Sequence, residues 1–181
     1  MLISSLTLPF DFDPNDNALF GVCFITCGLL GSFLSLTLLD KTRKFKCLHA
    51  TLISIALVGL PLVIIGLKQE SEAVLAIANG LLGLGVLPLL PVSMEFGAEL
   101  TYPNGASLMG GVLLGTSQLS ACLMILIGQF LISTFSVLST YIALILLALV
   151  ALMLSLFTAQ DLRRFRADSN AFEILRSKNA L

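Results

Sequence analysis

Long stretches without a charged side chain limit what this chain can become. Only 12% of its 181 residues are charged and 57% are hydrophobic. The uncharged runs cover residues 17–39, 47–67, 73–94 and 100–160. Because a helix needs about 20 apolar residues to cross the hydrocarbon core of a bilayer, each of the first three runs predicts one span. The chain is therefore predicted to be an all-α, multi-pass protein of the lipid bilayer.

The fourth run is long enough for two spans. A turn is expected at residues 103–105, where proline, asparagine and glycine follow each other, and a second turn at 133–136. Residues 1–10 are apolar but too short for a span, and they suggest the end of a helix that begins upstream. A bundle at 11–160 and a tail at 161–181 follow. We expect five full spans, at about 18–39, 47–67, 73–98, 107–132 and 137–158, the last uniformly apolar and facing lipid.

The basic residues orient the spans. Nine of the ten Lys and Arg residues lie within two segments, 41–46 and 163–178. Five spans place both segments on the same side, and the positive-inside rule makes that side the cytoplasm. We therefore predict an outside N-terminus and a cytoplasmic C-terminal tail, with the plasma membrane as the expected location.

The third span contains three glycines and two prolines between residues 80 and 91. Proline removes a backbone donor and glycine weakens a helix, so a kinked or interrupted helix is expected. Irregular backbone at membrane depth commonly lines a cavity in transporters, which makes Pro91 a candidate substrate-binding residue. Bending without substrate contact is the alternative.

Two carboxylates follow that break. Glu95 and Glu99 are four residues apart and share a helical face. A carboxylate pair facing lipid would be costly, so we expect it to meet the basic loop and form a cytoplasmic gate with Asp40 and Arg43. Proton coupling is a second interpretation. Simple interfacial charges, and a basic loop with an incidental aspartate, are the structural alternatives.

The fourth span carries small and polar residues on one face. Gln118 lies 11 residues beyond Ser107, roughly 16 Å along the helix axis and near the bilayer midplane. Transporters bind substrate at this depth, and an amide used only to join helices is the alternative. The face is expected to be tightly packed or to line a cavity. Its members are Ser107, Gly111, Gly115, Gln118 and Cys122, of which Gln118, Gly115 and Gly111 are candidate substrate-binding residues.

Several of these residues form motifs that resemble one family of transporters. The motifs are Leu39-Asp40-x-Thr42-x-x-Phe45-Lys46, Leu90-Pro91-x-x-x-Glu95-Phe96-x-x-Glu99-Leu100-Thr101-Tyr102-Pro103, Gln118, and Asp161-Leu162-Arg163-Arg164. They resemble the feline leukaemia virus subgroup C receptor-related family, solute carrier family 49, within the major facilitator superfamily.

The resemblance implies the C-terminal half of a twelve-helix fold. The five spans would then correspond to helices eight to twelve, and residues 1–10 to a remnant of helix seven. It also implies alternating-access movement of choline, ethanolamine or haem, with Gln118 at the position of a glutamine that lines the binding cavity. The partners implied are a small organic solute and a missing N-terminal half.

A truncated, non-transporting protein that pairs with or regulates a full-length relative is the alternative function. The sequence has no His-Glu-x-x-His motif and no serine with a histidine at helical spacing, so we do not predict an enzyme. No metal site, cofactor or nucleic-acid partner is predicted, and the cysteines are expected to pack as apolar residues.

Overall fold

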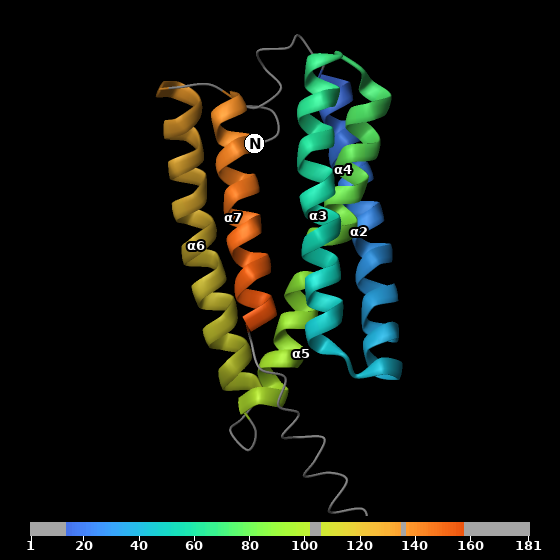
Figure 1. Cartoon of the computed structure of the whole chain (residues 1–181), viewed down its shortest axis with the longest axis vertical. Helices are drawn as coiled ribbons and strands as arrows, with labels where there is room; N and C mark the ends of the chain where they lie inside the picture. Colours follow the sequence, from blue (N-terminus) through green and yellow to red (C-terminus); the bar gives the residue numbers. More distant parts are fainter. Residues whose placement is uncertain (1–13, 102–105, 135–136, 158–181) are drawn as a thin grey trace, which may run out of the picture.

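The computed structural model describes residues 14–101, 106–134 and 137–157, and these residues form six helices and no strand. The helices run along the long axis of the molecule and alternate in direction, except that α5 continues in the direction of α4 (Figure 1). The predicted remnant at 1–10, the turn at 103–105 and the tail at 161–181 lie outside the described residues. The helices are α2 (Pro14–Thr42), α3 (Phe45–Lys68), α4 (Glu72–Val86), α5 (Leu89–Thr101), α6 (Ala106–Thr134) and α7 (Val137–Phe157).

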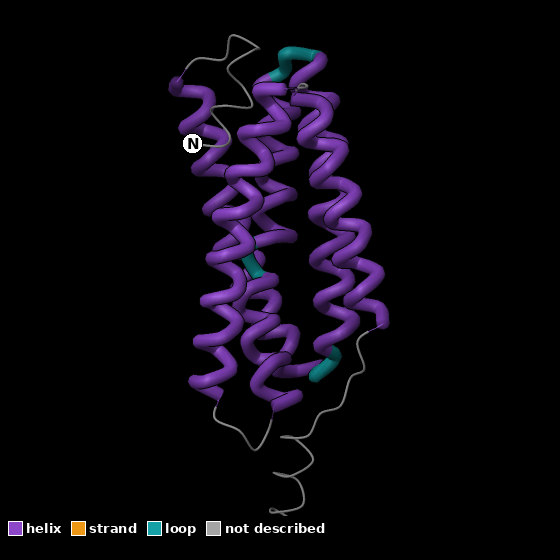
Figure 2. Tube along the Cα trace, turned by 90° about the vertical axis from the view of Figure 1, so that its left-hand side faces the viewer, coloured by secondary structure: helices purple, strands orange, loops and turns teal. Residues whose placement is uncertain are grey.

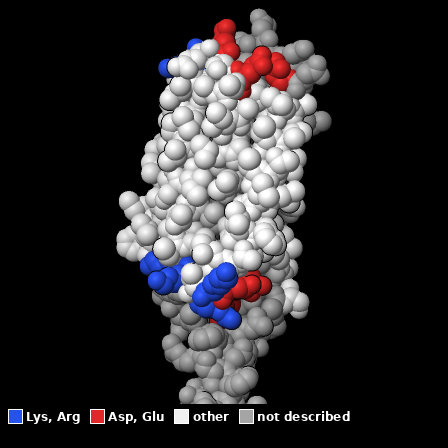
Figure 3. All heavy atoms as spheres, turned by 90° about the vertical axis from the view of Figure 1, so that its right-hand side faces the viewer, with Lys and Arg blue, Asp and Glu red and all other residues white. Residues whose placement is uncertain are grey.

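Five stretches of helix are long and apolar enough to cross a membrane, with α4 and α5 together making one of them. Figure 3 shows charged side chains at both ends of the long axis and an uncharged band between them. In a bilayer only closed barrels and helices satisfy every backbone polar group internally. The prediction of an all-α, multi-pass membrane protein with five full spans is confirmed.

The third span is interrupted where α4 ends and α5 begins. Leu87 and Pro88 form a turn between the two helices, near mid-height of the bundle (Figure 2). Pro88 and Pro91 have no N–H, so the carbonyls of Leu84 and Leu87 lose their usual partners four residues on. The backbone of α2 packs directly against the Leu84 carbonyl at Gly31. A Cβ added to Gly31 would lie only 3.0 Å from the carbonyl oxygen. The predicted break is confirmed, and α5 is free to leave the line of α4.

Glycines let α4 pack closely between α2 and α3. A Cβ added to Gly83 would overlap the Phe24 carbonyl on α2, and one added to Gly85 would lie 2.7 Å from the Ala56 nitrogen on α3. Backbones approach this closely only where side chains are absent. On the α3 side, Leu82 covers Gly59 in the same way. Helices α2, α3 and α4 therefore form the compact unit that positions the break.

Helix α7 packs against α3 as well as α6. Thr140 and Tyr141 are buried at its start, with 3% and 6% of their surface exposed, and Ser155 is buried near its end. We expected this span to be a scaffold that faces lipid, and its composition is nearly uniform. Most of its residues are exposed, but one side packs against protein.

Helix α6 stands apart from the α2–α4 unit and packs mainly against α5 and α7. All residues from 114 to 127 are exposed. Contact is confined to the two ends of α6, where Met109, Gly110 and Leu113 are half-buried near α5 and Gly128 is buried near the opposite end. The middle of α6 is thus uncovered by the described part of the chain.

Candidate functional site

The turn between α2 and α3 contains only Arg43 and Lys44. Arg43 has a φ of 55°, and its N–H donates to the Leu39 carbonyl at 2.8 Å. This left-handed conformation closes α2 and reverses the chain, although it costs a non-glycine residue roughly 1–2 kcal/mol. Backbone strain of this kind is often found at functional sites. The turn places Asp40 and Arg43 beside the start of α3.

A polar pocket of about 410 Å³ lies next to this turn and is lined by Leu36, Leu39, Asp40, Arg43, Phe45, Glu95 and Glu99. The structure therefore brings together all four residues that the sequence suggested as a gate. Two come from the end of α2 and its turn, and two from α5.

Burial differs among these four residues. Glu99 is 5% exposed, whereas Asp40, Arg43 and Glu95 are exposed. Arg43 and Glu99 each have an interaction partner. A carboxylate that is left buried without a partner is strongly destabilising, so the interaction of Glu99 helps to hold the end of α5 in place.

An aromatic contact beside the pocket joins the start of α3 to α5. The rings of Phe45 and Phe96 stack with centroids 5.5 Å apart and planes inclined by 18°. Phe45 belongs to a buried cluster with Leu39, Leu48, Leu52 and Val92, against which Phe96 also packs. This contact fixes the first turn of α3 against α5 and so keeps the glutamates at the pocket.

The predicted solute-binding face of α6 is open. Gln118, Gly115 and Gly111 are all exposed, and a Cβ added to either glycine would meet nothing within 4 Å. At ~100° per residue, this face lies about 140° around α6 from the side that contacts α5 and α7. The tight packing that was one expectation is therefore not found among the described residues. Pro91 is half-buried on α5 and does not line the charged pocket.

A second exposed stripe on α6 differs from the first in chemistry. It lies about 90° from the face of Gln118 and consists only of large apolar side chains. They are Leu108, Val112, Leu119, Leu123 and Phe130, each at least 55% exposed. Acyl chains suit these side chains, whereas a glutamine amide and bare glycine backbone suit water, a solute or a closely packed partner. Two of the exposed faces of α6 thus differ in chemistry.

Sequence reasoning missed one cavity. A largely apolar space of about 460 Å³ lies between α3, the broken helix and α7, and His49 and Ser93 are its polar lining residues. The Nδ1 atom of His49 is buried without a hydrogen-bond partner in the described part of the chain. His49, Ile53, Ala56 and Leu60 line it at helical spacing on α3, but only the arrangement of three helices shows that these residues meet a cavity.

The part of the chain that the structure describes contains no candidate metal site. Among the described residues, no group of three or more His, Cys, Asp or Glu side chains could hold a metal ion. Cys23, Cys27, Cys47 and Cys122 are free thiols, and the last two are exposed.

The apolar helices define a multi-pass membrane protein, and comparison with known sequences gives its relatives. No family model matches the chain. It is 27% identical over 148 residues to the choline/ethanolamine transporter flvcr2a of Danio rerio. It is 26% identical over 149 residues to an MFS-type transporter of Caenorhabditis elegans, and 29% identical over 124 residues to solute carrier family 49 member A3 of Xenopus tropicalis.

These matches cover 82%, 82% and 66% of this chain but only 32%, 25% and 26% of the respective relatives. The chain thus spans between a quarter and a third of the length of the curated relatives it matches. It is a relative of the major facilitator and solute carrier 49 transporters, as the sequence motifs suggested. These relatives are transporters, not enzymes.

Proposed function

We propose that this chain forms the C-terminal half of an alternating-access transporter of a small organic solute such as choline or ethanolamine. The exposed, small and polar face of α6 carries this proposal, because a glutamine held near mid-membrane is costly unless it meets water, a polar ligand or a partner. Transporters of this type bind substrate at the midplane between two repeats. The matching relative that is named a choline/ethanolamine transporter supports the choice of solute.

In this proposal the face of Gln118 lines the solute path and looks toward an N-terminal half. Gly111 and Gly115 leave bare backbone that a solute or an opposing helix can approach. The large apolar stripe of α6 faces lipid. The break between α4 and α5 allows α5 and α6 to move together while α4 stays packed between α2 and α3.

The charged pocket serves as the gate at the basic end of the bundle, which we place in the cytoplasm of a plasma-membrane protein. Asp40, Glu95 and Glu99 offer three acceptors to one guanidinium, that of Arg43. An arginine with several acceptors can exchange partners as helix ends separate and close, and no charge need be left buried alone in either state. Proton uptake by one of the glutamates is the alternative use of this pocket.

The experiment is uptake of labelled choline and ethanolamine by the protein in which this chain is joined to an N-terminal half. Gln118→Ala should lower uptake or raise the KM while surface expression stays unchanged. Leu119→Ala is the matched control, because Leu119 lies at the same depth on the apolar stripe. An unchanged concentration dependence in Gln118→Ala removes this residue from the solute path.

The open face of α6 also favours a second candidate function. A face of glycine and glutamine can pack on a helix of a full-length relative, and the chain would then regulate that relative without transporting a solute itself. Co-expression separates the two candidates. A regulator changes the uptake of the relative and adds none of its own, whereas a transporter half supports uptake only together with an N-terminal half.

A further inference from the structure

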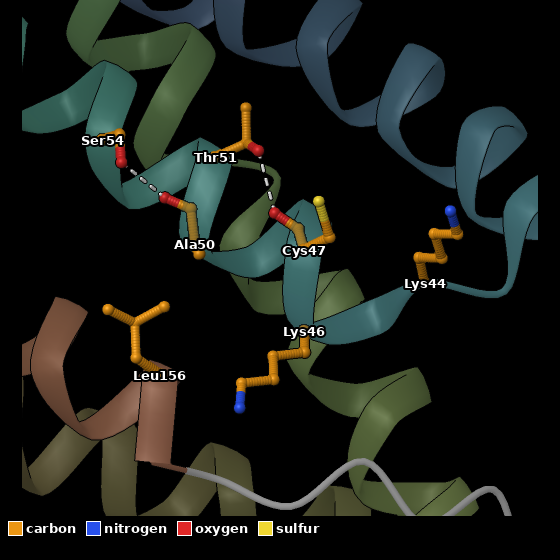
Figure 4. A pocket seen from close by; sticks show the side chains of 7 residues that line it. All are labelled: Lys44, Lys46, Cys47, Ala50, Thr51, Ser54 and Leu156. Atoms are coloured by element: carbon orange, nitrogen blue, oxygen red, sulfur yellow. Dashed lines mark hydrogen bonds between the residues drawn. The ribbon is translucent and has the colours of Figure 1, made fainter.

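A basic pocket lies at the start of α3, on the side that faces α7. It has a volume of about 620 Å³ and is lined by Lys44, Lys46, Cys47, Ala50, Thr51, Ser54 and Leu156. Figure 4 shows Lys46 projecting from the start of α3 toward the side of Leu156 on α7, whereas Lys44 projects from the preceding turn in the opposite direction. This pocket is distinct from the proposed gate, because the two share no lining residue.

The positive charge of this basic pocket is not balanced by the described residues that line it. The proposed gate combines Arg43 with three carboxylates, whereas among the described residues no acidic side chain lines the pocket of Lys44 and Lys46. Within this part of the chain, the charge of the two lysines is left for an anion to balance.

The depth of the pocket matches a lipid. The membrane-spanning stretch of α3 begins at Phe45, so Lys44 and Lys46 lie at headgroup level. Ser54 is ten residues beyond Lys44, roughly 15 Å deeper along the helix. The wall between them presents the methyl group of Ala50 and the side chain of Leu156. One end of the pocket thus suits a phosphate and the other an acyl chain.

The two hydroxyls in the wall are already engaged. Thr51 donates to the Cys47 carbonyl and Ser54 to the Ala50 carbonyl, each at 2.8 Å (Figure 4). Because each hydroxyl hydrogen is used within α3, these residues can lie beside a hydrocarbon chain without leaving a donor unpaired. Among the described lining residues, the two lysines are therefore the charged donors, and the Cys47 thiol is a weak one.

We propose that this pocket binds one anionic phospholipid, with its phosphate at Lys46, where the charges of both lysines attract it, and an acyl chain between α3 and α7. Basic pockets between membrane helices bind anionic head groups, and a lysine near the surface contributes about fivefold to such binding. Free phosphate shares the head-group chemistry but has no use for the apolar wall, so the lipid is the favoured source.

Native mass spectrometry of the purified full chain tests this site. The chain is equilibrated with phosphatidylglycerol and phosphatidylcholine of identical acyl chains, and retained lipid is counted. We expect one phosphatidylglycerol retained in preference to phosphatidylcholine. Lys44→Gln combined with Lys46→Gln should weaken retention about thirtyfold. Lys41→Gln combined with Lys68→Gln removes the same charge outside the pocket and should retain the lipid; equal loss in both pairs contradicts a defined site.

Two further arms test the acyl chain and the source of the phosphate. Thr51→Phe fills the wall and should reduce retention, whereas Val58→Phe, two turns further along the same exposed face, should not. Retention that is unaffected by Thr51→Phe overturns the placement of the acyl chain. Inorganic phosphate in large excess should fail to displace the lipid, and displacement would instead assign the lysines to free phosphate.

Discussion

Gly83 and Gly111 provide a sharp test of the packing, because the same substitution should have opposite effects at the two positions. A Cβ at Gly83 overlaps the Phe24 carbonyl and lies 2.8 Å from the Phe24 carbonyl carbon and 3.0 Å from its Cα. These are backbone atoms, which cannot rotate away, so α2 and α4 must separate. A Cβ at Gly111 meets nothing within 4 Å.

The magnitudes follow from these contacts. Overpacking of a well-packed interior costs about 1–3 kcal/mol, and Gly83→Ala should lie at the upper end because both partners are backbone. Gly111→Ala has no steric penalty and should gain about 0.5–1 kcal/mol from the better helix propensity of alanine. The two variants should therefore differ by at least about 2 kcal/mol in the free energy of unfolding.

Unfolding of the purified chain in mixed micelles, titrated with denaturing detergent and followed by circular dichroism, measures this difference. Wild type and both variants are compared at one micelle composition. If Gly83→Ala is as stable as Gly111→Ala, the close approach of α2 and α4 is not present, and the reasoning about the glycine-packed unit fails.

Three further substitutions test other parts of the account. Arg43→Gly and Arg43→Gln both remove the guanidinium beside buried Glu99 and should lower stability and the uptake by the protein joined to an N-terminal half. Arg43→Gly also removes the strain of a positive φ, so it should be the more stable of the two variants by about 1–2 kcal/mol. Phe96→Ala removes the stack on Phe45 and should lower the free energy of unfolding by about 2–4 kcal/mol, measured by the same detergent titration. An unchanged free energy of unfolding would mean that the stack does not hold α5. His49→Leu removes a buried nitrogen without a partner, so the free energy of unfolding should stay unchanged or rise by about 1 kcal/mol. A marked fall in the free energy of unfolding would show that this nitrogen has a partner.

The number of spans and the broken helix could be read from the sequence because the bilayer leaves few choices. Long uncharged runs must be helices there, and Pro88 and Pro91 remove two backbone donors wherever they fall. The grouping of Asp40 and Arg43 with Glu95 and Glu99 could also be anticipated, since charges avoid lipid and gather at the ends of spans.

The packing partners of each helix could not be predicted in the same way. Gly111 and Gly115 have the small-xxx-small spacing of a helix contact, yet they are open, while Gly83 and Gly85 lack that spacing and are closely packed. Lipid and protein interiors are equally apolar, so composition does not tell which face meets a neighbour. The burial of Tyr141 against α3 was missed for the same reason.

We propose that the face of Gln118 lines an aqueous solute path while the next residue, Leu119, faces lipid. Gln118→Cys and Leu119→Cys, each in a background without the four native cysteines, are exposed in membranes to a methanethiosulfonate reagent that carries a trimethylammonium group. The protein joined to an N-terminal half should react at Gln118→Cys, with protection by choline, and stay unreactive at Leu119→Cys. Equal reaction at both positions, or reaction at Leu119→Cys alone, would contradict the account.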